Sequence, residues 1–117
     1  MKLKRPATVV ELLVAARELI GVREHWCFGA MANTKLGRVT APLSPSATSW
    51  CTLGALRRVG AMRDAAVYCT SVGLLDDAAL ELWWFSAVEL NDSGKYPLVL
   101  EMFDLAIARA RELEAQS

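Results

Sequence analysis

Hydrophobic residues recur three and four positions apart near the start of the chain, the spacing of one face of an α-helix. Thr8 and Glu11 form a predicted capping box, in which the Thr hydroxyl accepts a hydrogen bond from the amide at position 11 and the Glu side chain reaches back. Gly21 is a typical helix stop. The pattern therefore predicts a helix over residues 8–21. Its apolar face consists of Val9, Leu12, Leu13, Ala16, Leu19 and Ile20.

Four further segments carry helical spacing, with start or stop signals at their ends. Ser44-Pro45 supplies an N-cap followed by proline at the first helical position, and Gly60 can end that helix. Asp76 is a predicted N-cap, and Pro97 opens the last helix. The four predicted helices cover residues 45–59, 61–72, 77–90 and 97–114.

The segments between these helices contain no predicted strand. Residues 25–32 are short, apolar and aromatic, and we interpret them as a single turn or a buried connector. Residues 33–46 are rich in turn formers and form the longest predicted loop. The stretch 39–43 is too short for a strand and is broken by Pro42. The sequence predicts a single all-α domain over residues 1–117, a compact bundle or orthogonal array of four to five helices.

A Trp-Cys motif occurs twice in the chain. Trp26-Cys27-Phe28-Gly29-Ala30 returns as Trp50-Cys51-Thr52-Leu53-Gly54-Ala55, with one residue inserted before the Gly-Ala pair. We expect two tight packing points that face each other, because an aromatic ring, a thiol and small residues pack densely. The Gly-Ala pairs are expected to let helices approach closely around the two Trp residues.

The composition indicates more apolar surface than a small monomer can bury. The chain is 54% hydrophobic, and about 58% apolar when Gly is counted and Tyr is not, against roughly 45–50% for typical domains on that basis. This excess favours self-association. Its 13 basic and 13 acidic residues cancel. A chain without net positive charge lacks the field that general nucleic-acid binding or electrostatic membrane docking requires. No apolar run approaches the roughly 18 residues of a membrane span. We predict a homo-oligomer, most simply a dimer, with neither nucleic acid nor membrane as its partner.

Three cysteines suggest free thiols and a reducing cytoplasm, because a secreted protein more often pairs its cysteines. Together with the single histidine they match the residue types of a Cys3His zinc site. These residues are His25, Cys27, Cys51 and Cys69. No Cys-x-x-Cys pair is present, so we interpret the thiols as small buried hydrophobes and predict neither metal nor cofactor.

Cys51 is the candidate nucleophile of the chain. In the predicted helix it lies in the second turn, where the helix dipole lowers a thiol pKa, and His25 is the only imidazole available as its base. The alternative is a Cys51 that packs in the core. Asn91 and Asp92 are candidate ligand-binding residues beside Trp50, although their local chemistry favours a turn that ends a helix.

The run Trp83-Trp84-Phe85 sweeps roughly 200° around a helix. Either the helix over 77–90 is central and buried on most sides, or one ring faces a partner or ligand. Trp and Phe are enriched in the cores of interfaces. Trp83 and Trp84 are therefore the candidate interface residues.

The segment Trp50–Leu56, together with Asn91-Asp92 before a final helix, resembles a family of small bacterial proteins of unknown function. Members of that family show Trp-Cys-x-x-Gly-Ala-Leu on a central helix and an upstream Gly-Ala segment, matched here by residues 27–30. Their last helix carries an Ala-Ile-x-x-Ala pattern, matched by residues 106–110. The resemblance covers about residues 9–113 and implies a shared α-helical fold without an assigned activity. It links one cluster of residues: Trp50, Cys51, Gly54, Asn91 and Asp92.

These observations favour a non-enzymatic helical interaction protein that self-associates in the bacterial cytoplasm. The alternative is a small-molecule-binding or thiol-dependent hydrolytic protein with a pocket near Trp50, Cys51 and Asn91. A third function, masking of another macromolecule, is permitted by the small size but selected by no residue.

Overall fold

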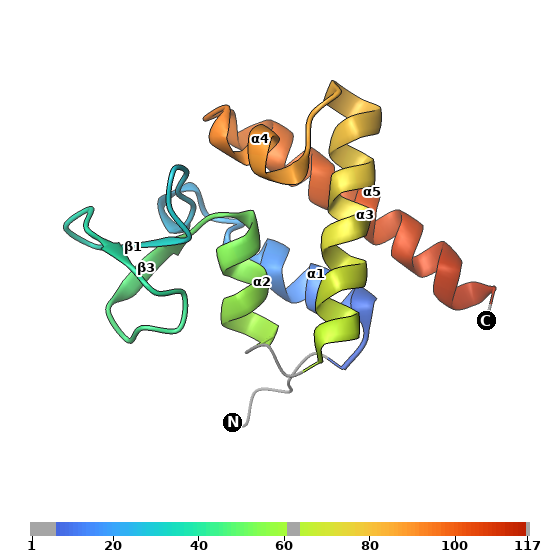
Figure 1. Ribbon diagram of the computed structural model, residues 1–117, viewed down its shortest axis with the longest axis horizontal. Helices are drawn as coiled ribbons and strands as arrows, with labels where there is room; N and C mark the ends of the chain where they lie inside the picture. Colours follow the sequence, from blue (N-terminus) through green and yellow to red (C-terminus); the bar gives the residue numbers. More distant parts are fainter. Residues whose placement is uncertain (1–6, 61–63, 117) are drawn as a thin grey trace.

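Five α-helices, one 3-10 turn and a small sheet make up the described part of the chain (Figure 1). The computed structural model describes residues 7–60 and 64–116. The elements in chain order are α1 (Val9–Leu19), η1 (Arg23–His25), β1 (Ala32–Thr34), β2 (Val39–Thr40), β3 (Ala47–Trp50), α2 (Thr52–Gly60), α3 (Ala65–Trp83), α4 (Ala87–Asp92) and α5 (Tyr96–Ala115).

The first and last helices lie where the hydrophobic pattern predicts them. The Thr8 side chain accepts a hydrogen bond from the Glu11 amide at 3.1 Å, which confirms the predicted cap of α1. Pro97 lies in the first turn of α5, where its missing N–H removes no helical hydrogen bond.

One long helix replaces two predicted ones. The sequence predicted helices at 61–72 and 77–90 with a break near Gly73, but α3 is continuous from Ala65 to Trp83. Gly73 lies on the exposed side of α3, and a Cβ there would meet nothing within 4 Å. The helix continues because its buried face runs through the predicted break. That face consists of Ser71, Leu75, Ala78 and Ala79. Residues 61–63 of the first predicted helix lie outside the described residues.

Asp76 was predicted to cap a helix at residue 77, which is wrong because Asp76 lies inside α3. Its carboxylate accepts a hydrogen bond from the Ala87 amide at 2.8 Å, in the first turn of α4. The N-cap of α4 is Ser86, which forms a capping box with Glu89. Asp76 thus ties the start of α4 to the middle of α3.

A three-stranded antiparallel sheet corrects the all-α prediction. The strand order is β2-β1-β3, and Asn33 on β1 pairs with Ser49 on β3. β3 occupies the first part of the predicted helix 45–59, which is helical only from Thr52. The extended conformation wins there because the backbone finds partners on β1 and because Thr and Trp fit a pleated strand. In Figure 1 the sheet lies to one side of the helices.

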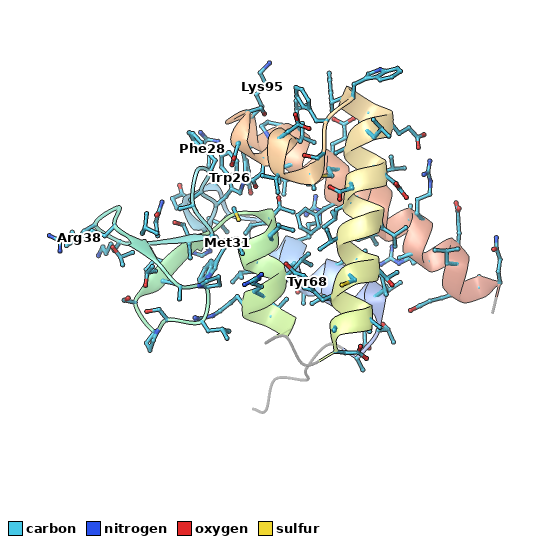
Figure 2. The ribbon with its side chains drawn as sticks, in the orientation of Figure 1. Trp26, Phe28, Met31, Arg38, Tyr68 and Lys95 are labelled. Carbon is cyan, nitrogen blue, oxygen red and sulfur yellow. The ribbon has the colours of Figure 1, made fainter. Side chains whose placement is uncertain are left out.

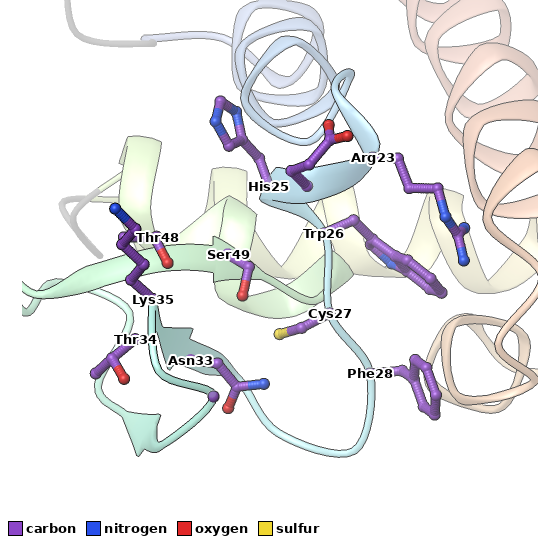
Figure 3. A pocket seen from close by; sticks show the side chains of 12 residues that line it. Arg23, His25, Trp26, Cys27, Phe28, Asn33, Thr34, Lys35, Thr48 and Ser49 are labelled. Carbon is purple, nitrogen blue, oxygen red and sulfur yellow. The ribbon is translucent and has the colours of Figure 1, made fainter.

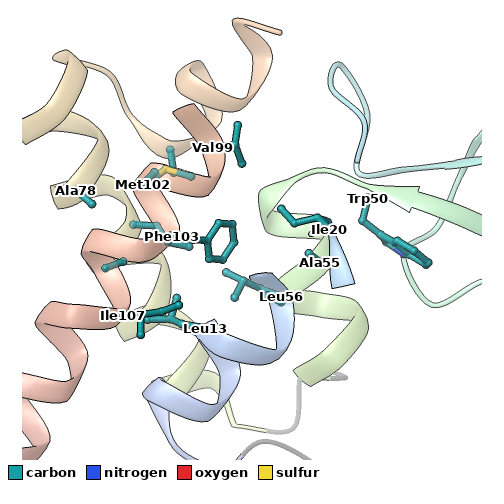
Figure 4. Packing of buried hydrophobic residues seen from close by; sticks show 14 of the residues in the cluster. Leu13, Ile20, Trp50, Ala55, Leu56, Ala78, Val99, Met102, Phe103 and Ile107 are labelled. Carbon is teal, nitrogen blue, oxygen red and sulfur yellow. The ribbon is translucent and has the colours of Figure 1, made fainter. Parts of the chain in front are cut away.

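The hydrophobic core lies between α1, α2, α3 and α5. Leu13, Leu56 and Phe103 come from three different helices, are fully buried and lie close together (Figure 4). Trp50, which is 6% exposed, belongs to the same cluster at the edge that faces the sheet. The core therefore fixes the end of β3 and the start of α2, which is where most of the predicted site residues lie.

Candidate functional site

The two Trp-Cys motifs lie side by side, as their repetition predicted. Trp26 and Trp50 form a parallel β-bridge, and the Cys27 amide donates a hydrogen bond to the Trp50 carbonyl at 3.1 Å. The Cys51 amide donates to the Met31 carbonyl at 3.1 Å. The connector over 25–32 is thereby anchored to the β3–α2 junction.

Gly54 brings α2 against this connector rather than against a second helix. A Cβ at Gly54 would lie 1.9 Å from the carbonyl oxygen of Met31, so no larger residue fits without backbone movement. We expected the Gly-Ala pairs to let two helices approach, and for Gly54 this is wrong because the neighbouring segment is not a helix. The close approach joins a helix to an irregular segment, and Figure 2 shows Met31 beside the start of α2.

Asn91 is the centre of the hydrogen-bond network at this junction. It is 1% exposed, and its Oδ1 accepts hydrogen bonds from the Trp26 indole N–H at 2.8 Å and from the Thr52 amide at 3.0 Å. The Thr52 hydroxyl donates to the same oxygen at 2.8 Å. The Asn91 amide nitrogen donates to the Cys27 carbonyl at 3.1 Å. Asn91 is thus the last buried residue of α4 and joins it to both Trp-Cys motifs.

The other two predicted ligand-binding residues also have partners within the protein. The Asp92 carboxylate accepts a hydrogen bond from the Gly29 amide at 3.1 Å. The Trp50 indole donates to the Pro42 carbonyl at 2.9 Å, and the Arg58 guanidinium lies 5.2 Å from the centre of the Trp50 ring. The structure therefore brings Trp50, Asn91 and Asp92 to one junction, where their polar groups connect chain segments.

Cys51 and His25 do not form a nucleophile–base pair in the described structure. Cys51 directly precedes α2, where its sulfur accepts a hydrogen bond from the Gly54 amide at 3.3 Å. Burial raises the pKa of the Cys51 thiol. His25 is exposed on η1, and no hydrogen bond joins it to Cys51. Cys51 is thus a buried capping thiol rather than a second-turn residue.

A cleft of about 620 Å³ lies between η1 and the sheet (Figure 3). Its polar lining includes His25, Cys27 and Ser49, and the buried Oδ1 of Asn33 has no hydrogen-bond partner among the described residues. Burial raises the pKa of the Cys27 thiol, so it is protonated at neutral pH. This cleft suits binding through polar groups better than nucleophilic attack, because the thiolate is the reactive form.

The residues of the candidate zinc site do not gather. Cys69 is exposed on α3, whereas Cys27 and Cys51 are buried at the junction. Within residues 7–60 and 64–116, no three His, Cys, Asp or Glu side chains form a group that could hold a metal ion.

An apolar surface surrounds the end of α3. We call it the aromatic surface; it consists of Leu80, Trp83, Trp84, Phe85 and Val88. Trp84 is 86% exposed and Trp83 is 42% exposed. Burial of all three rings in a central helix is therefore excluded. The helix ends instead at Trp84, whose φ of 61° is left-handed, so the chain turns away before the rings can be covered.

Charged residues of opposite sign lie on two sides of the aromatic surface. Trp84 lines a cleft of about 340 Å³ with three carboxylates, which we call the acidic flank: Asp76, Asp77 and Glu89. Trp83 lines a cleft of about 590 Å³ with two cations, which we call the basic flank: Arg23 and Lys95. Phe85 lines both clefts and therefore lies between the two flanks.

Comparison with known families identifies the group to which the chain belongs. The family of unknown function DUF6197 matches residues 4–109. The chain is a member of DUF6197. No curated protein and no solved structure matches it. The predicted resemblance to a family without assigned activity is thus confirmed, and the family supplies no reaction.

In this DUF6197 member, the sequence missed two residues of the Asn91 network, Trp26 and Thr52. The repeated Trp-Cys motif could have identified them, because Trp26 is the first residue of one copy and Thr52 the third residue of the other. No helix among the described residues is both long and apolar enough to cross a membrane.

Proposed function

We propose that this DUF6197 member is a non-enzymatic interaction module that pairs with a second copy of itself through the aromatic surface. The observation that carries the proposal is Trp84. Trp84 is 86% exposed at the end of α3 and lines one cleft together with Leu80 and Phe85. Trp is among the residues most enriched at the energetic centres of protein interfaces.

The backbone of Trp84 supports a functional role for its side chain. A left-handed conformation costs a non-glycine residue roughly 1–2 kcal/mol, and glycine is the usual residue at such a helix end. Trp84 adopts this conformation while its ring contributes little packing within the chain. Residues held in unfavourable backbone conformations cluster at functional sites.

A second copy is the partner that the composition favours. The balance of 13 basic and 13 acidic residues gives little long-range repulsion between identical molecules. The exposed rings extend the apolar excess of the chain to its surface, and contiguous exposed apolar patches mark interaction sites. We place the protein in a bacterial cytoplasm, because its resemblance is to bacterial proteins and because three free cysteines suit a reducing compartment.

The alternative function, thiol-dependent hydrolysis near Trp50, Cys51 and Asn91, has less support. Burial raises the pKa of both Cys27 and Cys51, which opposes formation of a thiolate. A ligand at Asn91 would have to displace hydrogen bonds that the protein already makes.

The test replaces Trp84 by glycine and measures the mass in solution by light scattering over a concentration series. Trp84→Gly removes the indole and also relieves the left-handed strain, so we expect the fold to gain about 1 kcal/mol while self-association is lost. The matched control is Leu36→Ala on the sheet side, since Leu36 is 83% exposed but lies outside the aromatic surface. A wild-type protein that stays monomeric at every concentration, or a Trp84→Gly variant of unchanged mass, would contradict the proposal.

A further inference from the structure

The larger cleft beside the aromatic surface is lined by three aromatic side chains, one of which is held by contacts within the chain. Trp83, Phe85 and Tyr96 all line the cleft. The Tyr96 hydroxyl donates a hydrogen bond to the Ile20 carbonyl at 2.7 Å, and its ring lies 5.4 Å from the Trp26 ring. Tyr96 is therefore held in place before anything binds. The cleft volume of about 590 Å³ is large enough for a bicyclic ring.

The basic flank at this cleft has no partner of opposite charge among residues 7–60 and 64–116. The Arg23 guanidinium lies 5.6 Å from the centre of the Tyr96 ring and 5.7 Å from that of Trp26. Neither Arg23 nor Lys95 forms an ion pair with another described residue. Cations beside an apolar cleft favour an occupant that brings an aromatic face and negative charge.

The other side of the aromatic surface carries a group with both properties, an exposed aromatic ring beside carboxylates. Trp84 presents a free indole, and it shares its small cleft with Asp77 and Glu89. Hydrogen bonds from Ser86 lower the pKa of the Glu89 carboxyl, so that carboxylate keeps its charge at neutral pH. Asp77 forms no ion pair within the described chain.

The two sides become complementary when one copy is rotated onto another. In a twofold dimer, any patch of one copy contacts the patch on the opposite side of the axis in its partner. Phe85 lines both clefts, so an axis near Phe85 brings the acidic flank of each copy to the basic flank of the other. The same rotation carries Trp84 of each copy toward the cleft of its partner.

We propose that the cleft between Trp83 and Tyr96 receives Trp84 of a second copy, with the acidic flank of each copy against the basic flank of the other. This pairing rests on the proposed self-association and specifies its geometry. The cleft is then incomplete in a single chain. Figure 2 shows Lys95 at the same end of the molecule as the end of α3, as this pairing requires.

The test reverses one charge on each flank. Lys95→Glu places a carboxylate on the basic flank, where it would face Asp77 of the partner copy, and Asp77→Lys places a cation on the acidic flank, where it would face Lys95 of the partner copy. Each variant alone places like charges at both contacts of its homodimer, so we expect its dimer dissociation constant to rise about tenfold at low salt. A mixture of the two variants restores opposite charges at both contacts, so the heterodimer should form with nearly wild-type affinity.

The measurement is native mass spectrometry of the mixture, with one variant labelled with nitrogen-15 so that the three dimers differ in mass. Lys35→Glu on the sheet side is the matched control and should dimerise like the wild type. Lys95 and Asp77 form no side-chain hydrogen bond or ion pair within the described chain, and a circular dichroism melt checks that both variants fold.

Three results separate this pairing from the proposed function. Preferred heterodimers in the mixture, with weak homodimers, are the expected result. Homodimers of Lys95→Glu and Asp77→Lys as stable as the wild type would overturn the pairing while leaving self-association intact. A wild-type protein that is monomeric in the same experiment would overturn both.

Discussion

At the scale of single residues, Asn91 holds together parts of the chain that are far apart in sequence. Its two polar atoms join α4 to residues 65, 64 and 39 positions earlier. An amide is suited to this role because it offers an acceptor and a donor on one short side chain. The network is buried, so its donors on Trp26 and Thr52 form their hydrogen bonds with Asn91 instead of with water.

We expect Asn91→Ala to lower the free energy of unfolding by about 3 kcal/mol or more, because it leaves buried donors on Trp26 and Thr52 without an acceptor. Urea denaturation of the purified protein measures this change. The matched control is Asn33→Ala, whose side-chain oxygen has no partner in the described chain. That variant should change stability by less than about 1 kcal/mol. Equal effects of the two substitutions would contradict the role of Asn91.

The three cysteines should react at different rates with a thiol reagent in native buffer. Cys69 is exposed on α3, whereas Cys27 and Cys51 are buried and have raised pKa values. We expect one fast and two slow thiols at neutral pH, with the slow pair reacting quickly only after unfolding. Cys69→Ser should remove the fast phase. Fast labelling of Cys51 in the folded protein would favour the hydrolytic alternative.

At the scale of elements, two glycines in helices have opposite consequences. Gly54→Ala should destabilise the protein by about 3 kcal/mol, because its Cβ meets the Met31 backbone and not a movable side chain. Gly73→Ala should stabilise the protein by about 0.5–1 kcal/mol, because the site is open and alanine favours a helix. Thermal melts of the two single variants test both signs. A neutral Gly54→Ala would mean that α2 can move away from the connector.

The sequence predicted helices well where one periodic face decides the structure. α1 and α5 each carry a long apolar face and a start signal, so their residues were found nearly in full. Gly73 and Asp76 misled because both are common at helix ends, yet the packing of Leu75 and Ala78 continues α3 past them. β3 was missed because its four residues form a strand only when β1 lies beside them.

The sequence could predict which residues form the candidate site, but not the hydrogen bonds between them. The repeated motif and the Asn-Asp pair pointed to Trp50, Cys51 and Asn91, which the structure brings to one junction. Their hydrogen-bond partners depend on how α4 packs against the connector, and no local pattern encodes that packing. The basic flank was not foreseen either, because Arg23 and Lys95 are far apart in sequence.

At the scale of the whole molecule, the short helix α4 lies between the internal network and the exposed rings at the end of α3. The last turn of α4 carries Asn91, which lies in the junction. In its first turn, the Ala87 amide donates a hydrogen bond to Asp76 on α3, and Ala87 follows Phe85 of the aromatic surface by two positions. A single element therefore links the buried junction to the proposed interface. Damage to the junction should reach self-association through α4, whereas loss of Trp84 should leave the junction intact.

The position of Asn91 along the chain also has a consequence for how the protein is made. During synthesis the segment that holds both Trp-Cys motifs leaves the ribosome first, and Asn91 follows Thr52 by 39 residues. Until α4 emerges, the indole N–H of Trp26 and the hydroxyl of Thr52 can bond only to water. The first half of the nascent chain therefore cannot form all of its buried hydrogen bonds alone. The sheet and its connector are joined to the helices only after Asn91 has been synthesised.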